Sequence, residues 1–293
     1  MRLLDTSSYT LTEFAGEDIP PYAILSHTWG EGEVLFHDIQ NGTAQSKQGF
    51  GKLVGCCQKA FEDGFKWVWI DTCCIDKTSS AELSEAINSM YQWHKDSIIC
   101  YAYLEDVTDV LRTPGAGSNH FTESRWFTRG WTLQELIAPR TVEFYTSNWL
   151  EIGTKRSFIV QIEIITGIPA RILHGEEVST CNVAQRMSWA SERQTTRRED
   201  MAYCLMGLFQ INMPLLYGEG DEAFVRLQEQ ILKQEEDYSI FAWTLQENRP
   251  QDLTGCLASS PYQTKHVADV DATRPVKRIL RQPDVPGYEK QEL

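Results

Sequence analysis

The chain has 293 residues, of which 42% are hydrophobic and 23% are charged. These fractions are typical of a globular protein and exclude a disordered or fibrous chain. With 27 basic and 41 acidic residues the net charge is −14, which argues against a nucleic-acid backbone or an anionic membrane surface as the main partner.

No stretch of the sequence approaches the roughly 18 consecutive apolar residues of a membrane helix. The first residues (MRLLD) also lack the apolar core of a signal peptide, so we expect a cytoplasmic protein without a membrane span. The eight cysteines include no CxxC pair and the six histidines are scattered. We therefore expect reduced, mostly buried thiols and no metal site.

The first half of the chain alternates between strand-like and helical patterns. Apolar runs predict four strands, at residues 22–25, 66–70, 97–103 and 141–145. Apolar residues at helical spacing predict helices between them, over 50–64, 83–94 and 123–138. This order is typical of right-handed crossovers, so the sequence predicts an α/β fold with a mostly parallel sheet flanked by helices.

The second half has a different character. Four segments are mainly helical in pattern, at 155–173, 182–192, 198–210 and 222–236, and 238–243 (YSIFAW) suggests a last strand. We interpret Gly218-Glu219-Gly220 as a turn entering a helix, because a bare GxG is a weak sign of a phosphate site. We thus divide the chain into an α/β core at 1–150, a largely helical extension packed on it at 151–243, and a tail or linker at 244–293.

Polar residues follow the first two predicted strands, where ligands of parallel sheets bind. Ser26, His27 and Trp29 follow the first strand and either line a nucleotide pocket or form a capped turn with Trp29 in the core. Asp71 ends the second strand and either binds a ribose or caps the next turn.

Two other residues have simpler interpretations. Cys73 would act as a nucleophile only with a partner such as His27 and a lowered thiol pKa, which nothing in the sequence indicates. His94 lies on an apolar helical stripe, so we expect a core histidine.

The segment 124–136 (SRWFTRGWTLQEL) combines aromatic and charged residues. As one helix, it would bury a stripe at Trp126, Gly130 and Leu133 and place Trp131 beside Glu135 on an adjoining face. Such a pair could stack on a flat cationic heterocycle and stabilise positive charge. The alternative is a core tryptophan with an exposed glutamate paired to Arg129 or Arg140, and the residues alone favour it.

A dense basic cluster lies at Arg193, Arg197 and Arg198. A phosphate contact is one interpretation. Pairing with Glu192, Glu199 or Asp200 is the one we expect, because charge runs usually lie on solvated faces.

Three long motifs, in order, resemble those of the fungal HET (heterokaryon incompatibility) domain. They are residues 22–30 (YAILSHTWG), 69–77 (WIDTCCIDK) and 129–136 (RGWTLQEL). Residues 196–208 and 216–220 also resemble the segments found downstream of these motifs in the family, so the resemblance covers about residues 1–243. It implies a cytosolic effector of programmed cell death in filamentous fungi.

The HET family is regarded as a distant relative of TIR domains, which have a flavodoxin-like fold. Many TIR domains cleave NAD+ at the nicotinamide–ribose bond with a glutamate in a Trp-Cys-Leu-x-Glu-Leu helix motif, which residues 131–136 (WTLQEL) resemble. The resemblance implies that Glu135 is catalytic and that Trp131 stacks on nicotinamide. On this hypothesis the substrate pocket is also lined by Ser26, His27, Trp29, Asp71 and Arg129.

On the same basis NAD+ is a substrate and no cofactor is needed. Because TIR enzymes often need assembly, the resemblance also implies self-association for activation and an upstream NLR-type or other sensor. The alternative is a self-associating signalling module that triggers death without enzymatic activity.

Overall fold

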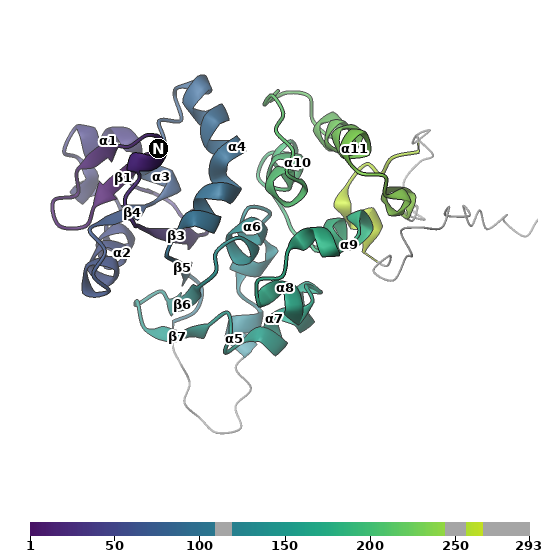
Figure 1. Cartoon of the computed structure of the whole chain (residues 1–293). Helices are drawn as coiled ribbons and strands as arrows, with labels where there is room; N and C mark the ends of the chain where they lie inside the picture. The colour runs from purple at the N-terminus through teal and green to yellow at the C-terminus, as the bar shows by residue number, and fades with distance from the viewer. Residues whose placement is uncertain (109–118, 244–255, 266–293) are drawn as a thin grey trace, which may run out of the picture.

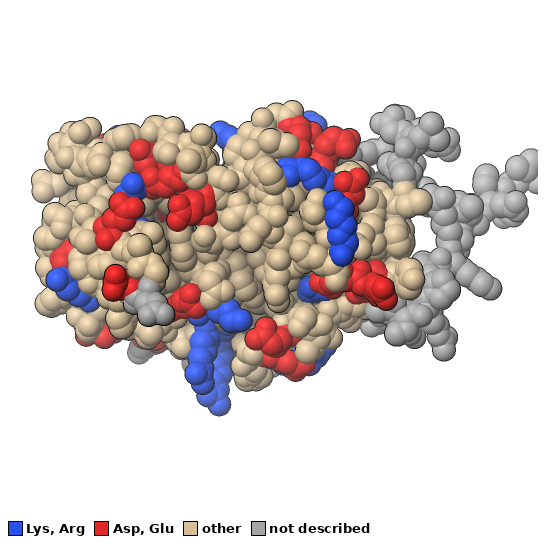
Figure 2. All heavy atoms as spheres, turned by 45° about the horizontal axis from the view of Figure 1, so that its top comes forward, with Lys and Arg blue, Asp and Glu red and all other residues tan. Residues whose placement is uncertain are grey.

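The structure is a computed structural model that describes residues 1–108, 119–243 and 256–265 (Figure 1). Most of the expected tail, at 244–255 and 266–293, lies outside the described residues. A sheet dominates the first half of the chain, and the regular elements described after residue 155 are all helical, as expected. Figure 2 shows acidic side chains over both halves, in keeping with the net charge of −14.

The sheet has seven strands in the order β2-β1-β4-β3-β5-β6-β7. Their bounds are β1 Arg2–Asp5, β2 Leu11–Glu13, β3 Ala23–His27, β4 Trp67–Trp69, β5 Ile99–Leu104, β6 Val142–Thr146 and β7 Glu151–Thr154. The four central strands, β4, β3, β5 and β6, are parallel and are those predicted from the apolar runs. In chain order they lie second, first, third, fourth, which is the flavodoxin-like arrangement.

Three short antiparallel strands extend this parallel centre. The hairpin of β1 and β2 joins the edge at β4, and β7 pairs with β6. None of the three was predicted. The β7 strand also lies within the part expected to be helical, so the sheet continues past residue 150.

The helices of the first half are α1 Phe36–Gln40, α2 Phe50–Glu62, α3 Asp71–Cys74, α4 Ser80–Asp96, α5 Asn119–Thr122 and α6 Thr132–Ile137, with 3-10 turns η1 Gly16–Asp18, η2 Ala44–Ser46 and η3 Arg125–Thr128. Those of the second half are α7 Ile159–Thr166, α8 Ala170–Leu173, α9 Val183–Ser188, α10 Asp200–Tyr203 and α11 Glu222–Gln234, with 3-10 turns η4 Val178–Thr180, η5 Met206–Phe209, η6 Tyr238–Phe241 and η7 Pro261–Thr264.

The single helix predicted over 123–138 is wrong. The chain forms η3, then a break at which Arg129 is extended, and only then the six-residue helix α6. The interruption has a physical cause, because Gly130 N donates to Gln194 O and Gln194 N donates to Thr128 O. These bonds to a distant segment use backbone groups that a continuous helix would pair internally.

The strand predicted over 238–243 is also wrong, because the segment forms the 3-10 turn η6. Asp237 caps this turn by accepting from Ser239 N, and its second carboxylate oxygen accepts from Val183 N at the start of α9. The side-chain cap competes successfully with strand pairing.

Alternate residues of β5 show which helices cover the two faces of the sheet. Tyr101 donates to Asp63 at the end of α2, and the Tyr103 ring lies 5.7 Å from the Lys52 amine of the same helix. On the opposite face, the Cys100 thiol donates to the carbonyl of Glu135 in α6. One buried hydrophobic cluster extends from Leu3 to Ala258, so both halves share a core.

Candidate functional site

Strand β3 distributes the predicted site residues over two faces of the sheet. In register, Ser26 lies beside Ala102 and His27 beside Tyr103. Because successive strand residues point to opposite faces, Ser26 is directed toward α6 and His27 toward α2. Five of the seven predicted site residues therefore form two polar networks at the carboxyl ends of the parallel strands.

The first network centres on Glu135 in α6. The Ser26 hydroxyl donates to the Glu135 carboxyl and accepts from the Trp126 indole at 2.8 Å. Glu135 is only 9% exposed, which corrects the expectation that it lies off the buried face of its helix. The alternative interpretation, in which Glu135 is exposed and pairs with Arg129 or Arg140, is therefore wrong.

This burial changes the acidity of the carboxyl. Burial raises the pKa of Glu135 to about 8, and the negative charge of Asp71 acts in the same direction. The Ser26 hydrogen bond and the positive charges of Arg193 and Arg129 oppose the rise. Near neutral pH, Glu135 is therefore poised between its protonated and ionised forms.

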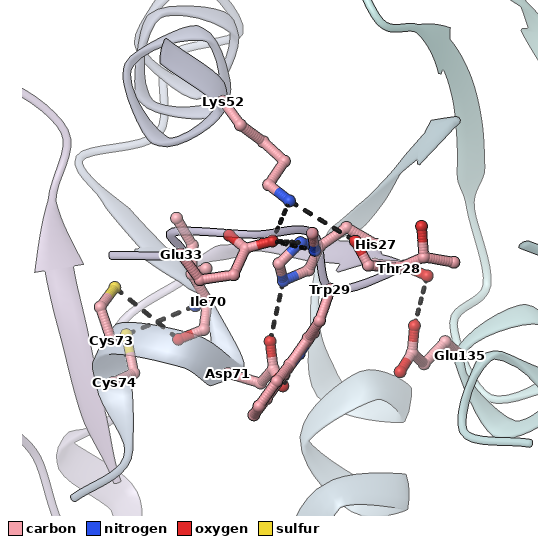
Figure 3. A network of polar contacts seen from close by, with 12 residues as sticks. His27, Thr28, Trp29, Glu33, Lys52, Ile70, Asp71, Cys73, Cys74 and Glu135 are labelled. Atoms are coloured by element: carbon pink, nitrogen blue, oxygen red, sulfur yellow. Dashed lines mark hydrogen bonds and ion pairs between the residues drawn. The ribbon is translucent and has the colours of Figure 1, made fainter. Parts of the chain in front are cut away.

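The second network joins His27, Trp29 and Asp71 on the other face (Figure 3). The two Asp71 oxygens contact His27 Nε2 and Trp29 Nε1, each at 2.9 Å. Burial would raise the pKa of Asp71, but the charge of Lys77 and the bonds from His27 and Trp29 hold it well below its usual range. Asp71 is therefore a fixed anion that orients both neighbours.

Three residues of this network were missed by sequence reasoning. Glu33 accepts from Gly30 N and pairs with the Lys52 amine. The Lys77 amine lies 3.5 Å from the centroid of the Trp29 ring and 3.8 Å from Asp71. Lys77 is the last residue of the motif at 69–77, so the sequence offered a sign that it belongs to the site. Lys52 lies within the predicted helix at 50–64, where no motif pointed to a functional role.

Two adjoining recesses lie over the ends of β3 and β5, the switch point of the parallel sheet. One, of about 530 Å³, is lined by Gly30, Glu31, Glu33, Gln48, Gly49, Gly51, Lys52, Tyr103, Glu105 and Ser147. The other, of about 510 Å³, is lined by Trp29, Gly30, Glu31, Glu105, Asp106 and Arg125. Trp29 is 48% exposed, so it presents a ring to solvent and is not the core residue of the alternative.

Neither recess is lined by Trp131 or Glu135. The Trp131 indole bonds to Asp200 in α10, whereas Glu135 is directed at β3. Arg129 donates to Thr196. The structure thus joins Ser26 to Glu135 and joins His27, Trp29 and Asp71 to one another, but it does not gather all seven predicted residues around one cavity.

Cys73 and His94 are both buried. Cys73 contacts the carbonyl of Ile70 rather than a histidine, and its hydrogen bond with Cys74, together with burial, raises its pKa. This is not the geometry of a cysteine nucleophile. His94 is a core histidine, as predicted, and bonds to Met90 O at 2.9 Å.

Arg193 and Arg198 of the basic cluster have partners far along the chain, whereas the glycine turn forms as predicted. Arg198 pairs with Asp221, and Arg193 is buried against the residues before α6, so the expected pairing with adjacent carboxylates is wrong for both. The predicted turn at 218–220 is confirmed. Its Gly218 and Gly220 amides donate to the Glu199 carboxylate.

Two kinds of feature are absent from the described residues. Within them, His, Cys, Asp and Glu side chains form no group of three that could hold a metal ion. In the same ranges, no helix has the length and apolar character needed to cross a membrane.

Comparison with known proteins gives two family matches. Residues 22–115 match the family model of the heterokaryon incompatibility protein (HET), and residues 222–283 match that of a domain of unknown function, DUF8212. The chain is 52% identical over 221 residues to the vegetative incompatibility protein HET-E-1 of Podospora anserina. That alignment covers 73% of this chain and 16% of the relative's length. No solved structure matches the chain.

Proposed function

Because the chain belongs to the heterokaryon incompatibility (HET) family, we propose that it acts in fungal incompatibility as an effector of cell death. We further propose that its activity is cleavage of NAD+ at the nicotinamide–ribose bond, with Glu135 as the catalytic carboxylate. The observation that carries this proposal is the buried Glu135 carboxyl, held by Ser26 at the edge of the sheet, with a pKa raised to about 8.

The chemistry needs one anion beside the ribose. The bond between the ribose anomeric carbon and the nicotinamide nitrogen breaks, and its electron pair leaves with nicotinamide, which becomes neutral. The ribose is left as an oxocarbenium-like cation, which an ionised Glu135 stabilises. Water then adds to the anomeric carbon and releases a proton, giving ADP-ribose.

The ionisation of Glu135 favours this class of substrate. A carboxyl whose pKa is about 8 binds a proton or a cation in preference to standing alone as an anion. The nicotinamide ring of NAD+ carries a positive charge, so its arrival favours the ionised form. Trp29, and Trp131 once freed from Asp200, are the aromatic surfaces for the two rings of the dinucleotide.

Access to Glu135 requires a rearrangement of the resting chain, because this residue lines neither recess. We propose that self-association of several copies exposes Glu135 to substrate at the carboxyl ends of the parallel strands. Activity should therefore rise more steeply than protein concentration. A sensor domain elsewhere in a longer protein could supply the same clustering.

The proposal is tested by the pH profile of nicotinamide release. If ionised Glu135 is required, kcat/KM should rise with pH through about 8, the value raised by burial. Glu135→Gln should abolish release at every pH. Glu199→Gln is the matched control, because Glu199 is also buried but binds the turn at 218–220. A flat profile, or equal loss in both variants, would contradict the role of Glu135.

A second candidate function is a signalling module that acts by self-association alone. One observation favours it, which is the exposed apolar face of α7, where Val160 and Ile164 are 60% and 76% exposed. Charged substitutions of these two residues should then prevent both clustering and cell death. Death that persists in Glu135→Gln but not in the α7 variant would favour this candidate over the enzyme.

A further inference from the structure

A segment of the helical half lies directly against the residues that precede α6. Gln194 forms a bridge with Arg129, in which Gln194 N donates to Thr128 O at 2.7 Å and Gly130 N donates to Gln194 O at 2.9 Å. The contact is close, because a Cβ on Gly130 would lie 2.4 Å from Thr195 Cγ2. The start of the Glu135 helix is thus held by residues about 65 positions further along the chain.

Arg193 extends this contact into the core. Its side chain is 5% exposed, and its Nη1 donates to Arg129 O at 2.8 Å and to Thr132 Oγ1 at 2.9 Å. Its Nε donates to Trp189 O. A buried guanidinium is therefore fixed at the first turn of α6, and its Nη2 amino group has no hydrogen-bond partner among the described atoms.

The position of Thr132 places this charge near Glu135. Thr132 and Glu135 are three residues apart in α6, so they lie on the same side of the helix, about 5–6 Å apart at Cβ. Glu135 and Arg193 influence each other's ionisation, each favouring the charged form of the other. Other groups that interact with Glu135 are Asp71, Arg129 and the thiols of Cys100 and Cys204.

We propose that Arg193 is a positioning residue, which fixes the first turn of α6 and supplies the buried positive charge that lets Glu135 ionise. Its consequence for catalysis rests on the proposed function of Glu135. The site is then incomplete without the helical half, because the charge that balances Glu135 comes from the segment after α9. Movement of that segment away from α6 would favour the protonated form of Glu135.

The test monitors the Glu135 carboxyl itself. The folded chain is labelled with carbon-13 at the glutamate carboxyls, the Glu135 signal is assigned with Glu135→Gln, and its titration is recorded without substrate. Arg193→Gln should raise the titration midpoint by about one pH unit, since a nearby opposite charge shifts a carboxyl by roughly one to three. Arg193→Lys keeps a basic group at this site, so its midpoint should rise less than that of Arg193→Gln.

The matched control is Arg186→Gln. Arg186 is also buried in the helical half, but it pairs with Glu235 and donates to Leu208 O, away from α6. Arg186→Gln should destabilise the fold without changing the midpoint of the Glu135 titration. An unchanged midpoint in Arg193→Gln would overturn the proposal. If Arg193→Gln does not fold, an unchanged midpoint in Arg193→Met, which also removes the charge, would overturn the proposal equally.

The titration separates this inference from the proposed function. It uses no NAD+, so a midpoint that moves in Arg193→Gln supports the role of Arg193 even if the chain never releases nicotinamide. The converse result is nicotinamide release that depends on Glu135, with a Glu135 midpoint that is the same in Arg193→Gln as in wild type. That result would support the enzymatic activity and would contradict the proposed role of Arg193.

Discussion

Ser26 and Glu135 are 109 positions apart in the chain, yet the Ser26 hydroxyl donates a hydrogen bond to the Glu135 carboxyl. The same hydroxyl accepts from the indole of Trp126. The end of strand β3, the turn η3 and helix α6 therefore meet at one oxygen atom. This arrangement fixes the orientation of a carboxyl that burial has made weakly acidic.

The first prediction concerns the pH dependence of stability. Burial raises the pKa of Glu135 from 4.5 to about 8, so between these values the folded chain holds a proton that the unfolded chain has released. The free energy of unfolding should fall as pH rises through this window, by up to about 1.4 kcal/mol per unit from this group. The full contribution of Glu135 to the free energy of unfolding is present only below its pKa in the unfolded chain, 4.5.

Glu135→Gln should remove this contribution, because glutamine keeps the volume and the Ser26 contact but does not titrate. Urea unfolding at several pH values between about 5 and 8 measures the slope for both proteins. Identical slopes would show that the Glu135 carboxyl is not buried as described. Glutamine is preferred to alanine here, because alanine would leave a cavity and an unpaired Ser26.

The second prediction compares two glycines. Gly130→Ala should lower the free energy of unfolding by about 1–3 kcal/mol, because its Cβ would lie 2.4 Å from Thr195 Cγ2 and 3.1 Å from Cys204 Sγ. Gly51→Ala should be neutral or stabilising by up to about 1 kcal/mol. Gly51 lies in α2, and no atom would approach its Cβ within 4 Å. Reversed effects in urea unfolding would contradict the contact between the two halves.

The third prediction concerns thiol reactivity. Seven of the eight cysteines are buried and Cys256 is exposed, and burial raises the pKa of Cys56, Cys57 and Cys100. Iodoacetamide should therefore modify Cys256 alone in the native chain and all cysteines in urea. Intact-mass analysis counts the labels. Rapid modification of Cys73 in the native chain would reopen the possibility of a cysteine nucleophile.

The fourth prediction concerns the fixed anion Asp71. Asp71→Asn should lower the free energy of unfolding at neutral pH by about 1–3 kcal/mol, because His27 and Trp29 lose a charged acceptor. Since the pKa of Asp71 is depressed, this stabilisation is present above the unfolded value and is lost only as pH falls toward the folded one.

The exposed Asp96 at the end of α4 provides the control, and Asp96→Asn should change stability by less than about 0.5 kcal/mol. A second readout is the indole N–H resonance of Trp29, which should shift in Asp71→Asn and not in Asp96→Asn. Equal stabilities of the two variants, with an unmoved Trp29 resonance, would rule out Asp71 as the residue that orients this ring.

The sequence predicted the parallel centre of the sheet because a local pattern of residues marks each of its strands. Each is a short apolar run followed by a polar residue, and β3 to β6 appear where those runs occur. The edge strands carry weaker signals. β2 has three residues and β7 has four, and neither is fully buried on either face, so no apolar run marks them.

The local spacing of apolar residues could not predict that the 123–138 segment breaks into η3 and α6. This break depends on the bonds of Thr128 and Gly130 to Gln194, and the partner lies in another half of the chain. The burial of Glu135 has the same origin, because Ser26 and Arg193 surround it from distant segments. Periodicity alone places a glutamate outward, and only the tertiary partners reverse that expectation.

The role of Glu135 in NAD+ cleavage is tested most directly by nicotinamide release from NAD+ across a protein concentration series, with wild type and Glu135→Gln measured side by side. We predict release by wild type that rises more steeply than concentration, and a loss of at least about 100-fold in the variant. Equal release by both proteins, or no release by wild type even when the chain is clustered, would contradict this role.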